Sequence, residues 1–253
     1  MSLDRREIVS LVIPATLATV WEHLRNPVLA RRWFGWDRPG LDEDIHTHLI
    51  GEPTESRSVD RDSTIHTLTW PHHDQVTVSG AAHEPGVTRI VVTRQSHEGL
   101  LGAYDGVRDE VDENWLTYAH QLHFALTVRP DEDRQTLAVF DLDAGDRRSR
   151  LLDRAGLHGV RGIPVGAHVQ ARRPDGTLLG GTVAYKAEHQ FGIHLHGVTE
   201  AFLVIRETPI ASHPPHGTVG AILSTYGLDP VTFDEVHARW SGWWKRSGAA
   251  VPA

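Results

Sequence analysis

Pairs of histidines with metal-ligand spacing stand out in a chain that contains no cysteine. His46-x-His48 and His194-x-His196 both fall in segments of strand character, where residues two apart share one face. Imidazole nitrogens bind zinc, and His66 or His189 could supply a third ligand. Solvent-facing positions in a chain with 18 histidines explain the pairs more simply, and no His-Glu-x-x-His motif is present. We therefore predict no metal and no cofactor.

Acid–base chemistry has two candidates on one predicted helix, His120 and His123, which flank its apolar stripe. A histidine facing a cavity could act as a general acid or base near neutral pH, whereas a histidine on the helix surface would have no such role. The chain has no nucleophile elbow, phosphate-binding loop or dinucleotide fingerprint. Catalytic residues are therefore left unassigned.

Aromatic residues are the strongest candidates for ligand contact. Several tryptophans could line a cavity and stack on a flat ligand, although ordinary core packing would also explain them. Tyr118 lies on the same helical stripe as Trp115 and offers a hydroxyl group. The candidate cavity residues are Trp33, Trp36, His66, Trp70, Trp115, Tyr118 and Leu122.

Composition narrows the classes of partner. The net charge is −8, and most of the acidic excess lies in the first half of the chain, which argues against binding to a nucleic-acid backbone. No apolar run approaches the roughly 20 residues of a membrane span. The charged N-terminus leads directly into a predicted strand and does not resemble a signal peptide. We expect a cytoplasmic protein whose partner is a small apolar molecule.

Hydrophobic periodicity divides the first half into one strand, two helices, a run of strands and a long helix. The predicted strands are Ile8–Ile13, Ile45–Ile50, Thr64–Trp70, Gln75–Ala82 and Val87–Gln95, and the predicted helices are Ala15–Leu24, Val28–Phe34 and Val107–Leu126.

The second half repeats this order after a charged break at Arg129–Arg134, which predicts domains at 1–129 and 135–253. A short helix is predicted at Arg147–Leu157, and Asp229-Pro230 is a typical start for the final helix. The predicted strands are Thr136–Leu142, Ala167–Arg172, Leu178–Lys186, Gln190–His196, Ala201–Glu207 and Thr218–Thr225.

A short repeat supports the idea of two related halves. Asp109-Glu110-Val111-x-x-x-Trp115 recurs as Asp234-Glu235-Val236-x-x-x-Trp240. Both copies fall near the predicted start of a helix that closes a sheet. Acids there favour the helix dipole, while Val and Trp share one face, so we interpret the motif as a packing device.

The first half resembles the SRPBCC superfamily, which has the START or Bet v 1-like helix-grip fold. Within it, residues 6–127 are most similar to the branch named after activator of Hsp90 ATPase homologue 1. The resemblance rests on Ile13-Pro14-Ala15, Val20-Trp21, Arg32-Trp33-Phe34-Gly35, Thr69-Trp70 and Asn114-Trp115. The second half lacks the Val-Trp and Trp-Phe-Gly elements, and we interpret it as a degenerate second copy.

The resemblance implies an α+β fold in which each of two helix-grip domains wraps a curved antiparallel sheet around a long C-terminal helix. It also implies a cavity between sheet and helix, so we favour binding of a small apolar or aromatic ligand in the first domain. A polyketide cyclase, aromatase or hydrolase is the enzymatic alternative, and an Hsp90-type chaperone partner is the third. Fold alone does not choose among them.

Overall fold

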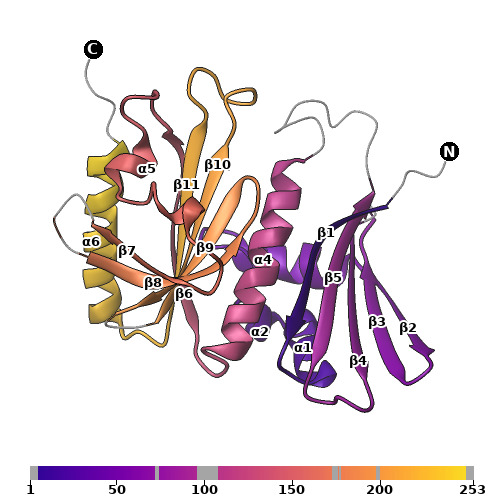
Figure 1. The fold of residues 1–253 in the computed structure, drawn as a ribbon. Coiled ribbons are helices and arrows are strands. Elements are labelled where there is room, and N and C mark those ends of the chain that lie inside the picture. The colour runs from indigo at the N-terminus through magenta and orange to yellow at the C-terminus, as the bar shows by residue number, and fades with distance from the viewer. Residues whose placement is uncertain are drawn as a thin grey trace. The chain divides into compact units, whose positions relative to one another are not determined.

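The computed structural model describes residues 5–71, 74–95, 108–172, 176, 178–197 and 200–248, with the side chains of 243–248 left out. The chain divides into two compact units, Met1–Asp133 and Arg134–Ala253. Each unit has its own sheet and its own long helix, and each is described by itself (Figure 1). Within the described residues, no helix is both long and apolar enough to cross a membrane.

The first unit is a five-stranded antiparallel sheet in the order β1-β5-β4-β3-β2. The long helix α4 packs against β1 and β5. The strands are β1 (Arg5–Ile13), β2 (Thr54–Asp60), β3 (Ser63–Thr69), β4 (Gln75–Ala81) and β5 (Thr88–Gln95). The helices are α1 (Leu17–Arg25), α2 (Pro27–Ala30), α3 (Leu41–Asp44), the π-helix η1 (Ile45–Gly51) and α4 (Glu110–Thr127).

One predicted strand is wrong: Ile45–Ile50 is helical and continues α3 as η1. Ile45 and Leu49 are both buried there, four residues apart on one helical face, and this spacing outweighs the apparent strand character. The strand in this part of the sheet is β2, which the sequence does not reveal because all its residues are exposed. An edge strand without a buried face has no hydrophobic alternation to detect.

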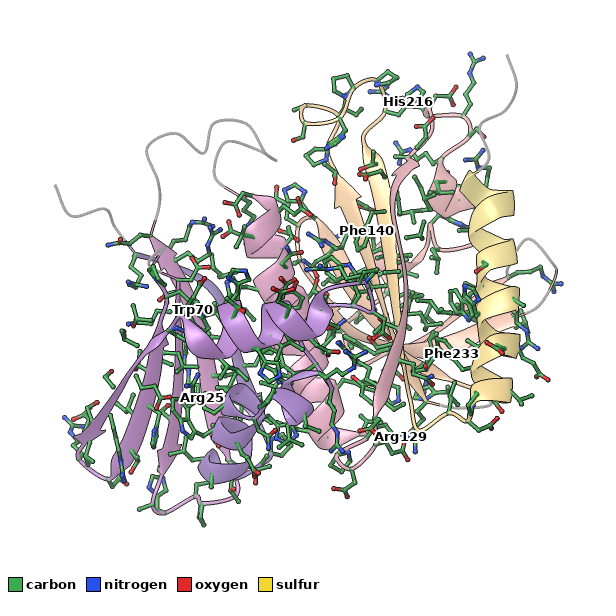
Figure 2. The ribbon with its side chains drawn as sticks, turned by 180° about the vertical axis from the view of Figure 1, so that it is seen from behind. Arg25, Trp70, Arg129, Phe140, His216 and Phe233 are labelled. Atoms are coloured by element: carbon green, nitrogen blue, oxygen red, sulfur yellow. The ribbon has the colours of Figure 1, made fainter. Side chains whose placement is uncertain are left out.

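The second unit is a six-stranded antiparallel sheet in the order β6-β11-β10-β9-β8-β7. Leu203, Ile205 and Leu223 lie in its main core with Trp240 of helix α6, and Phe233 of α6 packs against that core (Figure 2). The strands are β6 (Arg134–Asp143), β7 (His168–Arg172), β8 (Leu178–Lys186), β9 (Gln190–His196), β10 (Ala201–Thr208) and β11 (Thr218–Tyr226). The helices are α5 (Leu151–Arg154), the 3₁₀ turn η2 (Val160–Gly162) and α6 (Pro230–Gly248).

The two units share one topology. In each unit the first strand, β1 or β6, pairs with the last strand, β5 or β11, and the strands between form a meander. Short helices follow the first strand, and a long helix, α4 or α6, ends the unit. The fold class is therefore α+β with two helix-grip units, as predicted. The predicted short helix Arg147–Leu157 shrinks at both ends to α5. Gly156, with a left-handed φ of 74°, accounts for its early end.

The Asp-Glu-Val repeat occupies different positions in its two helices. Asp109 is the N-cap of α4, whereas Asp234 lies inside α6, whose start is capped by Asp229 accepting from the backbone N–H groups of Val231 and Thr232. Val111 is 41% exposed, while Val236 packs against the core of its unit. The dipole part of the interpretation therefore holds for the first copy, whose acids lie in the first turn of α4, and not for the second. The packing part holds for Val236 and Trp240 and fails at Val111.

Candidate functional site

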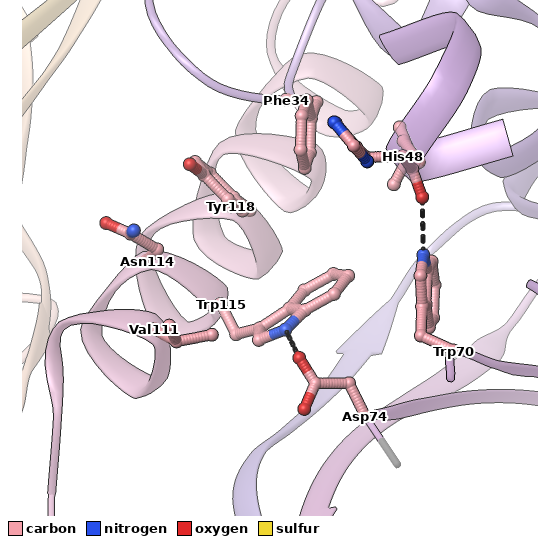
Figure 3. Close-up of a pocket in the computed structure, with 9 residues that line it drawn as sticks. Phe34, His48, Trp70, Asp74, Val111, Asn114, Trp115 and Tyr118 are labelled. Carbon is pink, nitrogen blue, oxygen red and sulfur yellow. Dashed lines mark hydrogen bonds between the residues drawn. The ribbon is translucent and has the colours of Figure 1, made fainter. Parts of the chain in front are cut away.

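A pocket of about 180 Å³ opens in the first unit between α4, η1 and the turn that joins β3 to β4 (Figure 3). Its wall combines aromatic rings and aliphatic side chains with a few polar groups. The lining residues are Phe34, His48, Leu49, Trp70, Asp74, Val111, Asn114, Trp115 and Tyr118.

Four aromatic rings form a connected wall around this space. Trp70 and Trp115 meet edge to face with centroids 5.2 Å apart, and Trp115 meets Tyr118 in the same way at 6.1 Å. Phe34 completes the wall at 4.6 Å from Tyr118. Offset and edge-to-face contacts of this kind are favourable and hold rings at defined angles.

Both indole N–H groups in the wall are already engaged by the protein. Nε1 of Trp70 donates to the carbonyl oxygen of His48 at 2.7 Å, and Nε1 of Trp115 donates to Oδ2 of Asp74 at 2.8 Å (Figure 3). These bonds fix the two indoles and remove their polar edges from ligand recognition. The tryptophans therefore offer the pocket apolar ring surface.

Asp74 is held in turn by a buried ion network beneath the pocket. Nε of Arg94 donates to Oδ1 of Asp74 at 2.8 Å, and Nη1 donates to Asp109 at 2.6 Å and to Asp112 at 2.5 Å. Nη2 of Arg6 reaches the other oxygen of Asp112 at 2.7 Å. The network joins β1, β5, the β3–β4 turn and the start of α4.

The charges in this network favour one another despite burial. Burial disfavours a charged guanidinium, but hydrogen bonds to Asp74, Asp112 and Asp109 outweigh it and raise the pKa of Arg94 above its ordinary value. Both oxygens of Asp74 accept hydrogen bonds, one from Arg94 and one from Trp115. Asp74 is therefore suited to positioning Trp115 and poorly suited to taking a proton from a substrate.

His48 brings an ionisable group to the pocket. Its Nδ1 lies 2.6 Å from Oε1 of Glu52, one turn further along η1. The side chain is 60% exposed, so the imidazole stands at the mouth of the pocket, and the close-up shows it near Phe34 (Figure 3). The other ring nitrogen, Nε2, lies 4.0 Å from Oδ1 of Asp44, so the imidazole stands between two carboxylates that orient it.

The predicted cavity residues divide into two groups. Trp70, Trp115 and Tyr118 line the pocket, while Trp36 lies behind Tyr118 with ring centroids 6.1 Å apart. Their contact with a ligand stays a prediction. Trp33 is buried in the core, where its Nε1 donates to the carbonyl oxygen of His23 at 2.9 Å.

Two further candidates lie away from the lining. Leu122 is fully buried on α4. His66 packs on Trp21 with ring centroids 4.6 Å apart, and burial, followed by the charge of Arg57, lowers its pKa. Neither residue is part of the pocket wall.

The two helix histidines do not line the pocket either. Burial, reinforced by the nearby His123, lowers the pKa of His120 to about 3, and burial also lowers the pKa of His123. Both imidazoles are therefore neutral at neutral pH.

Only one of the two predicted histidine pairs lies on a strand. His46 and His48 lie on η1, where residues two apart point to different sides, so the predicted strand pair does not form. His194 and His196 do lie on a strand, β9, and their rings are 4.4 Å apart. Glu200, which the sequence did not single out, lies close to both.

Sequence reasoning missed Asp74 and Phe34 as parts of the pocket wall. Asp74 falls in the turn after Trp70, where His72 and His73 lie outside the described residues. The sequence does indicate that Asp74 lies near Trp70, because Asp74 directly precedes a predicted strand and a short turn separates it from Trp70. Its partners Arg94 and Trp115 are distant in sequence, and no local pattern reports such contacts.

Comparison with known proteins gives only distant similarities. No protein-family model and no curated protein matches the chain. Among solved structures, the di-domain ARO/CYC BexL from the BE-7585A biosynthetic pathway is 12% identical, with 99% of this chain and 100% of that chain covered and a TM-score of 0.32.

Two further structures are similar at the same level. DynU16, a putative protein in the dynemicin biosynthetic locus, is 16% identical over 96% of each chain, with a TM-score of 0.29. The di-domain ARO/CYC StfQ from the steffimycin biosynthetic pathway is 13% identical over 90% of this chain and 86% of that chain, with a TM-score of 0.28. TM-scores this low establish no activity for this chain.

Proposed function

We propose that the first unit binds a small aromatic molecule in the pocket between α4, η1 and the β3–β4 turn. The observation that carries this proposal is the wall of Phe34, Trp70, Trp115 and Tyr118, whose two indoles are fixed by internal hydrogen bonds. Rigid rings lose little entropy when a flat ligand stacks on them, so their binding energy is available to the ligand.

The size of the pocket limits the ligand to about one ring. Pockets for drug-sized ligands measure about 300–1,000 Å³, whereas a cavity of about 150 Å³ holds benzene. At about 180 Å³ this pocket suits a substituted single ring, or a larger molecule that inserts one ring and leaves the rest outside. Val111 belongs to the lining and is 41% exposed.

Polar groups at the wall favour a ring with an oxygen substituent. Tyr118 and Asn114 on α4 and His48 on η1 supply a hydroxyl, an amide and an imidazole. Together they can both donate to and accept from a phenol or a ring ketone. An aliphatic alcohol would supply a hydroxyl group but no ring to stack on the aromatic wall, and we expect it to bind more weakly.

Titration of tryptophan fluorescence tests the proposal. We expect phenol and indole to give saturable quenching with a Kd of about 0.1–1 mM, or about 4–5.5 kcal/mol, which is reasonable for so few ligand atoms. Hexanol at the same concentrations should give a weaker response.

Two variants show where the ligand binds. Trp115→Phe should abolish most of the response, whereas Trp21→Phe is a matched control because Trp21 packs on His66 away from the pocket lining. A response that survives Trp115→Phe and disappears in Trp21→Phe would contradict the proposal.

An enzymatic function is the second candidate, and the pairing of His48 with Glu52 at the pocket mouth favours it. A carboxylate-oriented imidazole beside a bound ring could move a proton to or from a carbon next to a carbonyl group, as cyclisation or aromatisation requires. His48→Gln keeps a hydrogen-bonding side chain at the pocket mouth but removes the imidazole. It should weaken the binding of phenol only modestly and abolish turnover of a cyclisable poly-β-ketone. Equal turnover by His48→Gln and the unaltered chain would reject this role.

The narrower family prediction and the Hsp90-type partner stay predictions. A pull-down with the host Hsp90 tests the partner directly. The pocket itself supports small-molecule binding more than it supports a protein partner, because its volume accommodates one ring.

A further inference from the structure

The second unit gathers two histidines and a glutamate at the end of one hairpin. His194 and His196 point to the same face of β9, since side chains two apart on a strand share a face. β10 begins at Ala201, which pairs with Leu195, so Glu200 lies beside the last turn of the hairpin. One ligand atom from each of His194, His196 and Glu200 lies within 4.8 Å of the other two.

We propose that His194, His196 and Glu200 bind a divalent transition-metal ion, with Zn²⁺ as the best fit. Zinc takes imidazole nitrogens at about 2.0–2.1 Å and carboxylate oxygens at about 2.0–2.2 Å. In a tetrahedral site, ligand atoms at these bond lengths stand about 3.3–3.5 Å apart. Nε2 of His194 already lies 3.6 Å from Oε1 of Glu200, so small side-chain rotations complete the site.

The surroundings of His196 support this assignment. The hydroxyl of Thr182 on β8 lies 2.8 Å from Nε2 of His196 and 3.4 Å from Nδ1 of His168 on β7. A hydrogen bond on one nitrogen of a metal-binding histidine orients the ring and leaves the other nitrogen for the metal. His168 and Thr182 are paired across β7 and β8, and Thr182 is paired with His194 across β8 and β9.

Access and charge also suit a cation. The side chains of His194 and Glu200 are 22% and 42% exposed, while Nε2 of His194 is itself buried, so an ion reaches that nitrogen as the two side chains rotate. The three ligands are two imidazoles and one carboxylate. Calcium takes oxygen ligands and iron–sulfur clusters take thiolates, so this set favours zinc or a similar transition-metal ion. Three protein ligands leave a fourth position for water or an external ligand.

Isothermal titration of the full, EDTA-treated chain with ZnCl₂ tests the site. We expect one tight equivalent of Zn²⁺ that weakens at least tenfold in His196→Gln and in Glu200→Gln. His196 is exposed and Glu200 is partly exposed, so the fold should survive both substitutions, and far-UV circular dichroism checks this. Thr182→Val should weaken binding about tenfold, because it removes the bond that orients His196.

His216→Gln is the matched control. His216 also pairs with an acid in the second unit, with Nδ1 at 3.0 Å from Asp143, and it lies in the loop between β10 and β11 (Figure 2). We expect its zinc affinity to stay within about twofold of the unaltered chain. Unchanged affinity in His196→Gln and Glu200→Gln, or an equal loss in His216→Gln, would overturn the proposal. Co²⁺ as a second probe should give a visible absorption band that Glu200→Gln alters and His216→Gln does not.

Discussion

Replacing Arg94 by methionine removes the one cation that joins three carboxylates beneath the pocket. Its guanidinium is 7% exposed and donates to Asp74, Asp109 and Asp112. Methionine fills similar space but makes none of these bonds. Among the described residues, Asp112, whose side chain is fully buried, would keep its ion pair with Arg6 and lose the one with Arg94.

The magnitude follows from the uncompensated charge that remains. Removing one partner of a buried ion pair costs about 3–5 kcal/mol, which is a large share of the roughly 5–15 kcal/mol that stabilises a typical domain. At an m value of about 2 kcal/mol per M, the urea midpoint of the first unit should fall by about 1.5–2.5 M. The loss should also weaken ligand binding, because Asp74 would no longer hold Trp115 in place.

Urea unfolding followed by fluorescence and circular dichroism measures this loss. Arg89→Met is the matched control, since Arg89 lies exposed on the same strand and its Nε donates to Ser10 at 3.1 Å. A surface contact of that kind contributes within about 0.5 kcal/mol. A loss below about 1 kcal/mol in Arg94→Met, or equal losses in the two variants, would refute the account of the buried network.

Three further predictions concern stability. His120 has a pKa of about 3 in the folded chain and an ordinary value of 6.5, so between these values only the unfolded chain binds a proton there. Acidification from pH 6.5 to 5 should therefore lower the free energy of unfolding by about 2 kcal/mol. Urea titrations at several pH values measure this slope, and His120→Gln should flatten it. Gly192→Ala would place a methyl group 2.3 Å from the ring of Tyr185 and should lower the melting temperature by several degrees. In the control Gly180→Ala the methyl group meets no atom within 4 Å, so the melting temperature should change little. Equal shifts in the two variants would contradict this prediction. Asp229→Ala removes the N-cap of α6 and should lower the free energy of unfolding, measured by chemical denaturation, by about 1 kcal/mol. Asp229→Ser keeps a capping oxygen and should retain most of that stability.

The sequence predicts the fold well where one face of an element is buried. β8 and β9 have the predicted bounds, and β10 and β11 are each one residue longer, because their apolar positions face a core. The fully exposed β2 and the helical segment Ile45–Gly51 were missed. β2 has no alternation of buried and exposed positions that a sequence pattern could report. Ile45–Ile50 was predicted as a strand, although its buried residues Ile45 and Leu49 are four positions apart, as on a helix.

The candidate site is only partly predictable for a related reason. Trp115 and Tyr118 share a helical stripe, so their periodicity reveals a common face. The contacts of Asp74 with Arg94 and Trp115 bring together residues 20 and 41 positions apart in the chain. Such contacts depend on the register of the strands and on how the helix packs against the sheet. Local sequence propensity predicts neither of these.

Asp74 serves the stability of the fold through one oxygen and the shape of the pocket through the other. This double use constrains how the sequence can diverge. In more distant relatives, Asp74 and Arg94 should be retained or lost together, whereas Phe34 and Val111 are free to change with the ligand. A family alignment would therefore separate residues that keep the pocket open from residues that choose its occupant.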